Sequence, residues 1–230
     1  MQYPFVASEN HVFVDLAEGR FLVDTGSPLS FAANGSLTIG GRTHAVARKL
    51  GAFDVETIGR LVTGPCEGLI GMDLLGAGGV ILDLPGGVIH IGPPANAAPD
   101  RAAVCPMRSV LGTPVVSTVV NGRRVDAVFD TGAQYGYLCD AALAAGLPQD
   151  GAIDDYNPVL GEMHSPAWRV VVSIAGVEFE DRVGLLTGLG ASMLQMIGVS
   201  AVIGCAMLRD HVVALTPNRG ELAIWQPPPG

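Results

Sequence analysis

The tripeptide Asp-Thr-Gly occurs twice in the sequence, at residues 24–26 and 130–132, and each copy directly follows three apolar residues. An apolar run that ends in Asp-Thr-Gly predicts a buried strand leading into a tight turn that carries a carboxylate. Each copy is followed further along the chain by two apolar residues and a glycine, at residues 69–71 and 202–204. Two signatures that recur in the same order predict two structurally similar halves.

The halves also match beyond these signatures. After Gly71 the chain has a short apolar segment and then two apolar strands that flank a glycine-rich turn. The same succession follows Gly204, and the spacing from Gly71 to Ile91 equals that from Gly204 to Ile224. Each succession predicts a short helix and a β-hairpin. The sequence therefore predicts an all-β, two-lobed fold with an internal pseudo-twofold repeat.

A segment rich in proline and alanine marks the boundary between the halves. Residues 93–102 are predicted to be a linker, so residues 1–92 form the first predicted lobe and residues 103–230 the second. The second half alone has a predicted helix starting at Asp140 and a polar stretch at residues 154–166 before its next strand. The first half passes directly to a predicted hairpin that turns at Gly40 and Gly41, and we expect it to lack both features.

Composition restricts the partners that the chain can have. Hydrophobic residues make up 49% of the chain and charged residues 15%, and the formal net charge is −9. These values predict a folded globule and argue against nucleic acid or an anionic membrane as a partner. We expect a soluble, cytoplasmic protein, because no apolar run could span a membrane and no signal peptide is recognisable. The four cysteines form no CxxC pair, and we expect mostly free thiols in a reducing compartment.

The paired signatures resemble those of the aspartic proteases of the pepsin and retropepsin group. The matching residues are Asp24-Thr25-Gly26-Ser27 with Leu69-Ile70-Gly71, and Asp130-Thr131-Gly132-Ala133 with Val202-Ile203-Gly204. The chain length and the alanine after the second motif resemble a retropepsin-like subunit that has been duplicated and fused. The resemblance implies an aspartic endopeptidase without metal or cofactor, in which Asp24 and Asp130 activate a water to cut a peptide or protein bound in extended form.

The resemblance also assigns supporting roles around the two aspartates. The two threonines are expected to cross-link the active-site loops through their hydroxyl groups, and the two motif glycines to leave space for the tight turns. The segments Leu69-Ile70-Gly71 and Val202-Ile203-Gly204 are expected to pack beneath these loops. Ser27 can donate a hydrogen bond to Asp24, whereas the side chain of Ala133 has no donor. We therefore expect Asp24 to be the more acidic partner and Asp130 to carry the shared proton.

Enzymes of this group close a β-hairpin flap over the substrate, and the polar stretch of the second half is the candidate flap. Its candidate residues are Val159, Leu160, Gly161, Glu162, Met163 and His164. The first half has no segment of comparable length, whereas pepsin carries its flap in the first half. The flap is therefore expected on the lobe opposite to that of pepsin.

Two other functions stay open at this point. The shortened first half is compatible with a catalytically silent peptide-binding module, and an enzyme active only as a homodimer is the second alternative. A monomer with a complete site is expected, because one chain carries both motifs. The remaining acidic residues near the motifs are expected to be solvated loop charges: Asp54, Glu56, Asp154 and Asp155. Tyr135 and Tyr137 are expected either to line the cleft or to pack in the core, and the histidines show no spacing typical of metal ligands.

Overall fold

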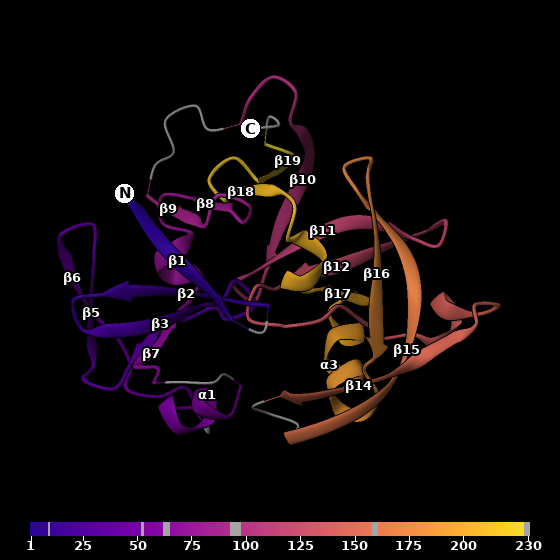
Figure 1. The fold of residues 1–230 in the computed structure, drawn as a ribbon, viewed down its shortest axis with the longest axis horizontal. Helices are drawn as coiled ribbons and strands as arrows, with labels where there is room; N and C mark the ends of the chain where they lie inside the picture. Colours follow the sequence, from indigo (N-terminus) through magenta and orange to yellow (C-terminus); the bar gives the residue numbers. More distant parts are fainter. Residues whose placement is uncertain (9, 52, 62–64, 93–97, 158–160, 228–230) are drawn as a thin grey trace.

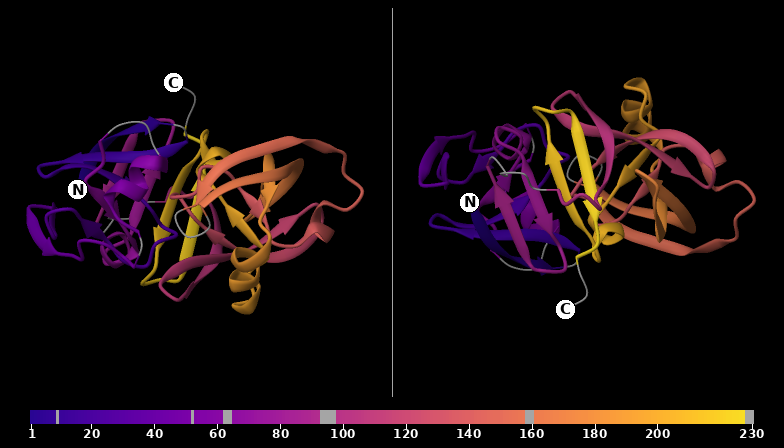
Figure 2. Two further views of the ribbon diagram at one scale, coloured as in Figure 1. Left: turned by 90° about the horizontal axis from the view of Figure 1, so that it is seen from below. Right: turned by 90° about the horizontal axis from the view of Figure 1, so that it is seen from above.

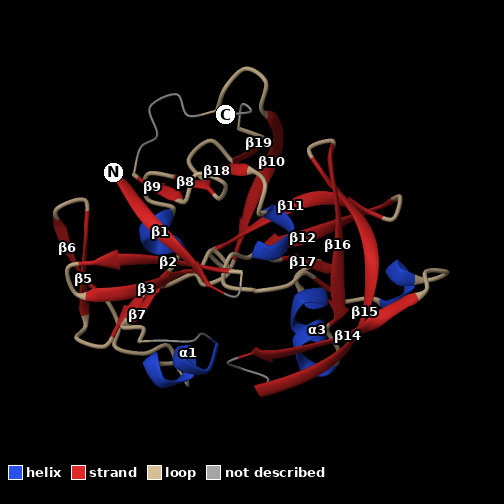
Figure 3. Ribbon diagram, viewed as in Figure 1, coloured by secondary structure: helices blue, strands red, loops and turns tan. Residues whose placement is uncertain are grey.

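The computed structural model describes residues 1–230 except 9, 52, 62–64, 93–97, 158–160 and 228–230. Strands dominate the described residues and the helices are short (Figure 3), which confirms the predicted all-β class. The two halves of the chain form two lobes that lie side by side, the first coloured indigo to purple and the second mainly orange (Figure 1). Residues 93–97, in the predicted linker, lie outside the described residues.

The first half is built from short strands and two helices. Its strands are β1 (Gln2–Ser8), β2 (His11–Leu16), β3 (Gly19–Val23), β4 (Phe31–Ala32), β5 (Ser36–Ile39), β6 (Arg42–Ala45), β7 (Gly68–Ile70), β8 (Val80–Asp83) and β9 (Val88–Ile91). Its helices are α1 (Val55–Leu61) and α2 (Met72–Leu75). The predicted hairpin at Gly40 and Gly41 is confirmed, because β5 and β6 pair on either side of these glycines and both have positive φ.

The second half has a similar order of elements with an additional strand and an additional 3-10 helix, and its strands β14 to β16 are longer than β5 and β6. Its strands are β10 (Ala103–Val110), β11 (Thr113–Val120), β12 (Arg123–Phe129), β13 (Tyr137–Leu138), β14 (Gln149–Asn157), β15 (Gly161–Ile174), β16 (Val177–Leu185), β17 (Ala201–Ile203), β18 (Val212–Thr216) and β19 (Glu221–Trp225). Its helices are α3 (Gly188–Met196) and two 3-10 helices, η1 (Ala141–Ala144) and η2 (Cys205–Leu208). The helix expected after Asp140 is η1, which Asp140 caps by accepting a hydrogen bond from the backbone N–H of Ala142 (2.8 Å).

One antiparallel sheet joins the two halves, and we call it the shared sheet. Its strands lie in the order β1, β9, β8, β18, β19, β10, so the final hairpins of the two halves meet edge to edge. The joining pair is β8 with β18, in which Leu82 lies opposite Val213 and Val80 opposite Leu215. Both views in Figure 2 place the yellow strands of this sheet between the purple first half and the orange part of the second half.

Each half places a parallel strand pair at its centre. The strand that precedes Asp24, β3, runs parallel to β7, with Val23 opposite Ile70. The strand that precedes Asp130, β12, runs parallel to β17, with Phe129 opposite Ile203. A short strand, β4 or β13, flanks β7 or β17 on its other side in antiparallel orientation. The carboxyl ends of β3 and β12 therefore lie in equivalent environments.

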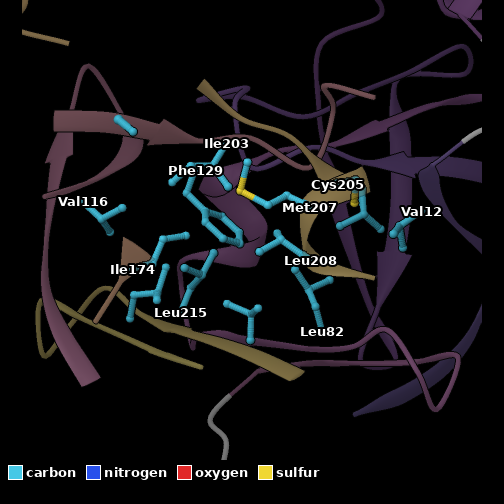
Figure 4. Packing of buried hydrophobic residues seen from close by; sticks show 14 of the residues in the cluster. Val12, Leu82, Val116, Phe129, Ile174, Ile203, Cys205, Met207, Leu208 and Leu215 are labelled. Atoms are coloured by element: carbon cyan, nitrogen blue, oxygen red, sulfur yellow. The ribbon is translucent and has the colours of Figure 1, made fainter. Parts of the chain in front are cut away.

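The main hydrophobic core extends across both halves. Val12 and Leu82 of the first half belong to one buried cluster with Phe129, Ile203 and Leu215 of the second, and Figure 4 shows these side chains packed together. The four cysteines are free thiols and buried, as expected. None of the described helices is long and apolar enough to cross a membrane.

The four acidic residues expected to be loop charges lie in or beside regular elements. Glu56 belongs to α1, and Asp154 and Asp155 belong to β14. Residues 154–157 and 161–166 belong to the paired strands β14 and β15. The loop charge expected at Asp54 is instead at the start of α1, where its Oδ1 accepts a hydrogen bond from the backbone N–H of Thr57 (3.0 Å). Alternation between polar and apolar residues is weak in both segments, so the pairing partners decide their structure rather than the local pattern.

Candidate active site

The structure brings the two predicted aspartates into contact. Asp24 follows β3 and Asp130 follows β12, and their carboxyl groups are hydrogen-bonded to each other. Each carboxyl group also lies against the glycine of the opposite motif. A Cβ atom at Gly26 would be 2.3 Å from Cγ of Asp130, and one at Gly132 would be 2.4 Å from Cγ of Asp24. Any side chain at either glycine would therefore displace a carboxyl group.

The two threonines lock the active-site loops together. The hydroxyl group of Thr25 donates to the backbone carbonyl of Phe129 (2.7 Å) and accepts from the backbone N–H of Thr131 (3.0 Å). The hydroxyl group of Thr131 likewise donates to the carbonyl of Val23 (2.8 Å) and accepts from the N–H of Thr25 (3.0 Å). Both threonines are fully buried. Four bonds that cross between the halves thus fix the two aspartate turns relative to each other.

The apolar-apolar-glycine segments support the same turns from below. The backbone N–H of Asp24 donates to the carbonyl of Ile70 (3.0 Å), and that of Asp130 donates to the carbonyl of Ile203 (3.0 Å). A Cβ atom at Gly71 would lie 2.5 Å from the carbonyl oxygen of Leu29. One at Gly204 would lie 2.2 Å from the carbonyl oxygen of Tyr135. Glycine is therefore required at both positions by the close approach of the turn backbone. Leu69 lies beside Ile70 in β7, and Val202 beside Ile203 in β17.

The expected role of the Ser27 hydroxyl group is wrong. Its Oγ donates to the backbone carbonyl of Leu29 (2.8 Å), and it is the backbone N–H of Ser27 that donates to Oδ1 of Asp24 (2.9 Å). The equivalent backbone groups act on the other aspartate. The N–H groups of Gly132 and Ala133 donate to Oδ1 of Asp130 (2.8 and 3.2 Å). The hydrogen bonds from the turns to both carboxylates come from the backbone, and Ala133 donates one as Ser27 does.

The surroundings of the pair raise the pKa of both carboxyl groups, and which of the two carries the shared proton stays a prediction. Burial raises the pKa of Asp24 well above its ordinary value, and the neighbouring charge of Asp130 raises this pKa further. Burial raises the pKa of Asp130 as well, but the N–H groups of its own turn and the hydrogen bond from Asp24 oppose the rise. Asp24 is the more deeply buried of the two. Burial therefore favours the protonated form of both carboxyl groups, most strongly for Asp24, within a pair that titrates as a unit.

The dyad lines a cavity of about 560 Å³ to which both halves contribute. The first half provides a wall of mostly apolar residues that includes Pro28, Leu29, Leu50 and Phe53. The second half provides Val128, Leu186, Val202 and the inner side of α3, with Gly190, Met193 and Leu194. The described lining residues include three carboxylates, those of Asp24, Asp130 and Asp155, and neither lysine nor arginine. The cavity lining thus combines mainly apolar residues with three carboxylates.

The described part of the candidate flap is the stem of a long β-hairpin. Gly161, Glu162, Met163 and His164 begin β15 and pair with residues 154–157 of β14, whereas Val159 and Leu160 lie outside the described residues. Met163 lines the cavity. The neighbouring His164 is exposed and its Nδ1 lies 2.6 Å from Oδ1 of Asp154. The hairpin belongs to the second lobe and reaches the cavity beside α3 (Figure 1).

The hydrogen bond between Tyr137 and Asp155 could not be predicted from the sequence. Tyr137 is buried in β13 and its hydroxyl group donates to the Oδ2 atom of Asp155 in β14, and both residues line the cavity. Burial, followed by the Asp155 carboxylate, raises the pKa of Tyr137, which therefore stays protonated as a donor. Asp155 is accordingly not a solvated loop charge. Leu50, Phe53 and α3 are also additions to the predicted site, since their positions depend on packing and no local pattern marks them.

No metal site accompanies the dyad in the described part of the chain, which has no group of three or more His, Cys, Asp or Glu side chains that could hold an ion. The carboxyl pair at the described site can take part in acid–base chemistry. One carboxylate can accept a proton and one carboxylic acid can donate a hydrogen bond on the same side of the cavity.

Comparison with solved structures identifies the fold. No protein-family model matches the chain, and no curated protein sequence matches it. Among solved structures, an aspartic proteinase from Irpex lacteus aligns over 99% of this chain and 97% of its own, with a TM-score of 0.55 and 14% identity. The basic 7S globulin from soybean aligns over 97% of this chain and 94% of its own, with a TM-score of 0.54 and 12% identity. The chain has the fold of the pepsin-like aspartic proteinases.

Proposed function

We propose that the protein is an aspartic endopeptidase that hydrolyses peptide bonds with a water activated by Asp24 and Asp130. The observation that carries this proposal is the hydrogen-bonded carboxyl pair in the lining of a cavity to which both halves contribute. The fold alone is insufficient support, because its structural neighbours include a protein named as a proteinase and another named as a globulin. The dyad supports a hydrolytic site over a simple peptide-binding groove.

In the proposed mechanism the two carboxyl groups have different tasks. The charged Asp130 accepts a proton from the water as its oxygen attacks the scissile carbonyl carbon, while the protonated Asp24 hydrogen-bonds the carbonyl oxygen. Asp130 then gives this proton to the nitrogen of the tetrahedral intermediate, the C–N bond breaks, and the carboxyl pair is left as it began, with one proton on Asp24 and the charge on Asp130. The fixed turns support this mechanism, because they hold both carboxyl groups in place before substrate binds.

The substrate that fits is an extended polypeptide with apolar side chains on either side of the cut bond. The cavity is bounded by the edge of the β14–β15 hairpin, which can pair with an extended chain through backbone hydrogen bonds. Its walls are mainly apolar, including Leu186 and Val202 on one side and Leu29 and Phe53 on the other. One chain contributes both aspartates, and we therefore propose a monomer as the active form, without a nucleic-acid or membrane partner.

Cleavage of a mixed peptide library tests the proposal. The wild-type chain is expected to cut library peptides and to be blocked by a statine-type inhibitor, whereas Asp24→Asn and Asp130→Asn are each expected to lower kcat by about 10²–10⁴-fold. Asp126→Asn is the matched control, because Asp126 is a partly exposed acid that pairs with Arg108 (2.9 Å) away from the cavity lining. Peptide binding without cleavage by the wild type would identify a catalytically silent module, and activity that disappears on dilution would identify the homodimer.

The stability of the dyad variants separates lost chemistry from lost folding. A carboxyl group whose folded-state pKa is raised stabilises the protein fully below its unfolded pKa, and this contribution is lost as pH rises through the folded value. Because the pKa of Asp24 is raised well above 3.8 in the folded protein, this carboxyl group opposes folding at neutral pH, where the unfolded chain holds it ionised. Asp24→Asn is therefore expected to unfold at a temperature equal to or higher than wild type at pH 7. A large loss of stability would mean that its inactivity reports misfolding.

A further inference from the structure

Helix α3 carries an exposed apolar stripe. Leu189, Met193 and Met196 are 65%, 54% and 86% exposed, and they are spaced four and three residues apart on one face of the helix. Single exposed apolar residues are ordinary on a protein surface, but a contiguous group of large ones marks an interaction site. We call Leu189, Met193 and Met196 the α3 stripe.

The stripe lies in a long uncharged region of the chain. Residues 183–208 contain no aspartate, glutamate, lysine, arginine or histidine. The opposite side of α3 is used for packing, since Ala191 is buried and Leu194 packs against the clusters that contain Tyr137 and Val128. The helix therefore has its core contacts on one side and leaves the α3 stripe uncovered on the other.

The stripe is continuous with the cavity that the dyad lines. Met193 both lines that cavity and belongs to the stripe, and Leu189 and Met196 extend the apolar surface beyond the cavity lining along the helix. In both views of Figure 2 the helix lies at the edge of the second lobe. A polypeptide that leaves the cavity on this side meets the stripe next.

We propose that the α3 stripe is a docking surface for an apolar, uncharged segment of the polypeptide substrate, adjacent to the residues held in the cavity. This inference rests on the proposed function and extends it, because it makes a second apolar segment part of substrate selection. Methionine suits such a surface, since its flexible thioether side chain adapts to different apolar partners. The protein thereby prefers long, apolar polypeptides over short peptides that fill only the cavity.

A lipid membrane fits this surface less well. Interfacial helices combine an apolar face with lysine and arginine on the polar face. Helix α3 and its flanking residues contain no lysine and no arginine. The formal net charge of −9 also disfavours approach to an anionic bilayer. An uncharged peptide segment meets neither obstacle.

The test compares a short and a long peptide that share one cleavable sequence. The short peptide fills the cavity only, the long peptide adds an apolar segment of about six residues, and a third peptide replaces that segment by serine and glycine. For the double variant Leu189→Gln/Met196→Gln, the KM for the long peptide is expected to rise by about tenfold while the values for the other two peptides stay unchanged. Neither residue lines the cavity, so the basal reaction is unaffected.

Val104→Gln is the matched control. Val104 is 52% exposed on β10 of the shared sheet, which Figure 1 shows away from α3, and its replacement is expected to change none of the three KM values. An unchanged KM for the long peptide in the double variant would overturn the inference. So would a wild-type dimer that the double variant abolishes, or binding of wild type to neutral or anionic vesicles that the double variant loses.

A binding measurement keeps this inference separate from the proposed function. Fluorescence anisotropy with Asp24→Asn measures peptide affinity without any cleavage. The long peptide is expected to bind about tenfold more tightly than its serine-glycine counterpart, and the double substitution on α3 is expected to remove this difference. Equal affinity for the two peptides would overturn the docking surface even in a chain that cleaves peptides, and a difference would support it even in a chain that does not.

Discussion

Each active-site threonine serves the opposite half of the molecule. Thr25 satisfies backbone groups of Phe129 and Thr131, and Thr131 satisfies those of Val23 and Thr25. These groups are buried, and an unpaired buried donor or acceptor costs about 1–3 kcal/mol. The hydroxyl groups therefore contribute both to the stability of the fold and to the relative position of the two aspartates.

Replacement of Thr25 by valine separates these two effects. Thr25→Val keeps the shape of the side chain but leaves the carbonyl of Phe129 and the N–H of Thr131 without their partner, so the free energy of unfolding is expected to fall by about 2–5 kcal/mol. We also expect kcat to fall, because the aspartate turns are no longer fixed. Thr118→Val is the control: its buried hydroxyl group donates only to the carbonyl of Ser173 (2.7 Å) within the second half. It is expected to lose stability with kcat unchanged, as measured by denaturant titration and peptide kinetics.

The pH dependence of activity is fixed by the carboxyl pair and its backbone donors. A bell-shaped profile is expected, because cleavage requires one proton on the dyad. The midpoint of each limb is expected at a pH above 3.8, the ordinary pKa of an aspartic acid, because burial raises the pKa of Asp24 and of Asp130. Ser27→Ala is expected to leave the acid limb in place, because the Ser27 hydroxyl group bonds Leu29 and the donor to Asp24 is a backbone N–H. A shift of the acid limb in this variant would contradict the bonding described for Ser27.

At the scale of elements, the two lobes enclose the cavity in different ways. The second lobe uses the β14–β15 hairpin and α3, whereas the first uses the segment around Leu50 and Phe53 that precedes α1. The hairpin stem is held near the cavity by one side-chain contact in particular, the hydrogen bond from the buried Tyr137 to Asp155. This bond links β13, which flanks the active-site strands, to the hairpin.

Loss of the Tyr137 hydroxyl group is expected to weaken substrate binding more than stability. Tyr137→Phe keeps the packed ring and frees the hairpin stem, so KM should rise several-fold while the unfolding temperature falls by about 1–6 °C, which corresponds to a typical hydrogen bond. Tyr3→Phe is the matched control. The Tyr3 hydroxyl group accepts from the N–H of Gly40 (2.8 Å) away from the cavity lining, and its loss should lower stability with KM unchanged. Equal KM values in the two variants would show that the hydrogen bond from Tyr137 to Asp155 does not position the hairpin.

At the scale of the whole molecule, the shared sheet and the core make the two halves one folding unit. The β8–β18 pair joins the halves by backbone hydrogen bonds, and Leu82 and Leu215 beside it belong to one hydrophobic cluster. The threonine bonds join the halves a second time at the active site. A lobe without its partner would expose an edge strand and part of its core.

Calorimetry is expected to record a single unfolding transition, with calorimetric and van't Hoff enthalpies in agreement. Leu215→Ala removes a fully buried side chain beside the joint and is expected to cost about 2–5 kcal/mol while the transition stays single. Leu111→Ala, at a site 78% exposed, is the matched control and should leave the transition temperature unchanged. Two resolved transitions would show that the lobes fold independently.

The sequence by itself determined the parts of this protein that depend on short segments. An apolar run followed by Asp-Thr-Gly specifies a buried strand and a tight turn, and the glycine-marked hairpins follow from local backbone preferences. The repetition of these signals gave the all-β class and the positions of Asp24, Asp130 and the residues beneath them. These features were predictable because their physical causes lie within a few neighbouring residues.

The tertiary structure alone decided which groups meet. It determined that a backbone N–H of Ser27 rather than its hydroxyl group serves Asp24, that Tyr137 holds Asp155, and that Phe53 and α3 border the cavity. It also decided that the two final hairpins pair with each other. The local sequence around each of these residues does not indicate its contact partner. Burial and hydrogen bonding are determined by the packing of the whole chain.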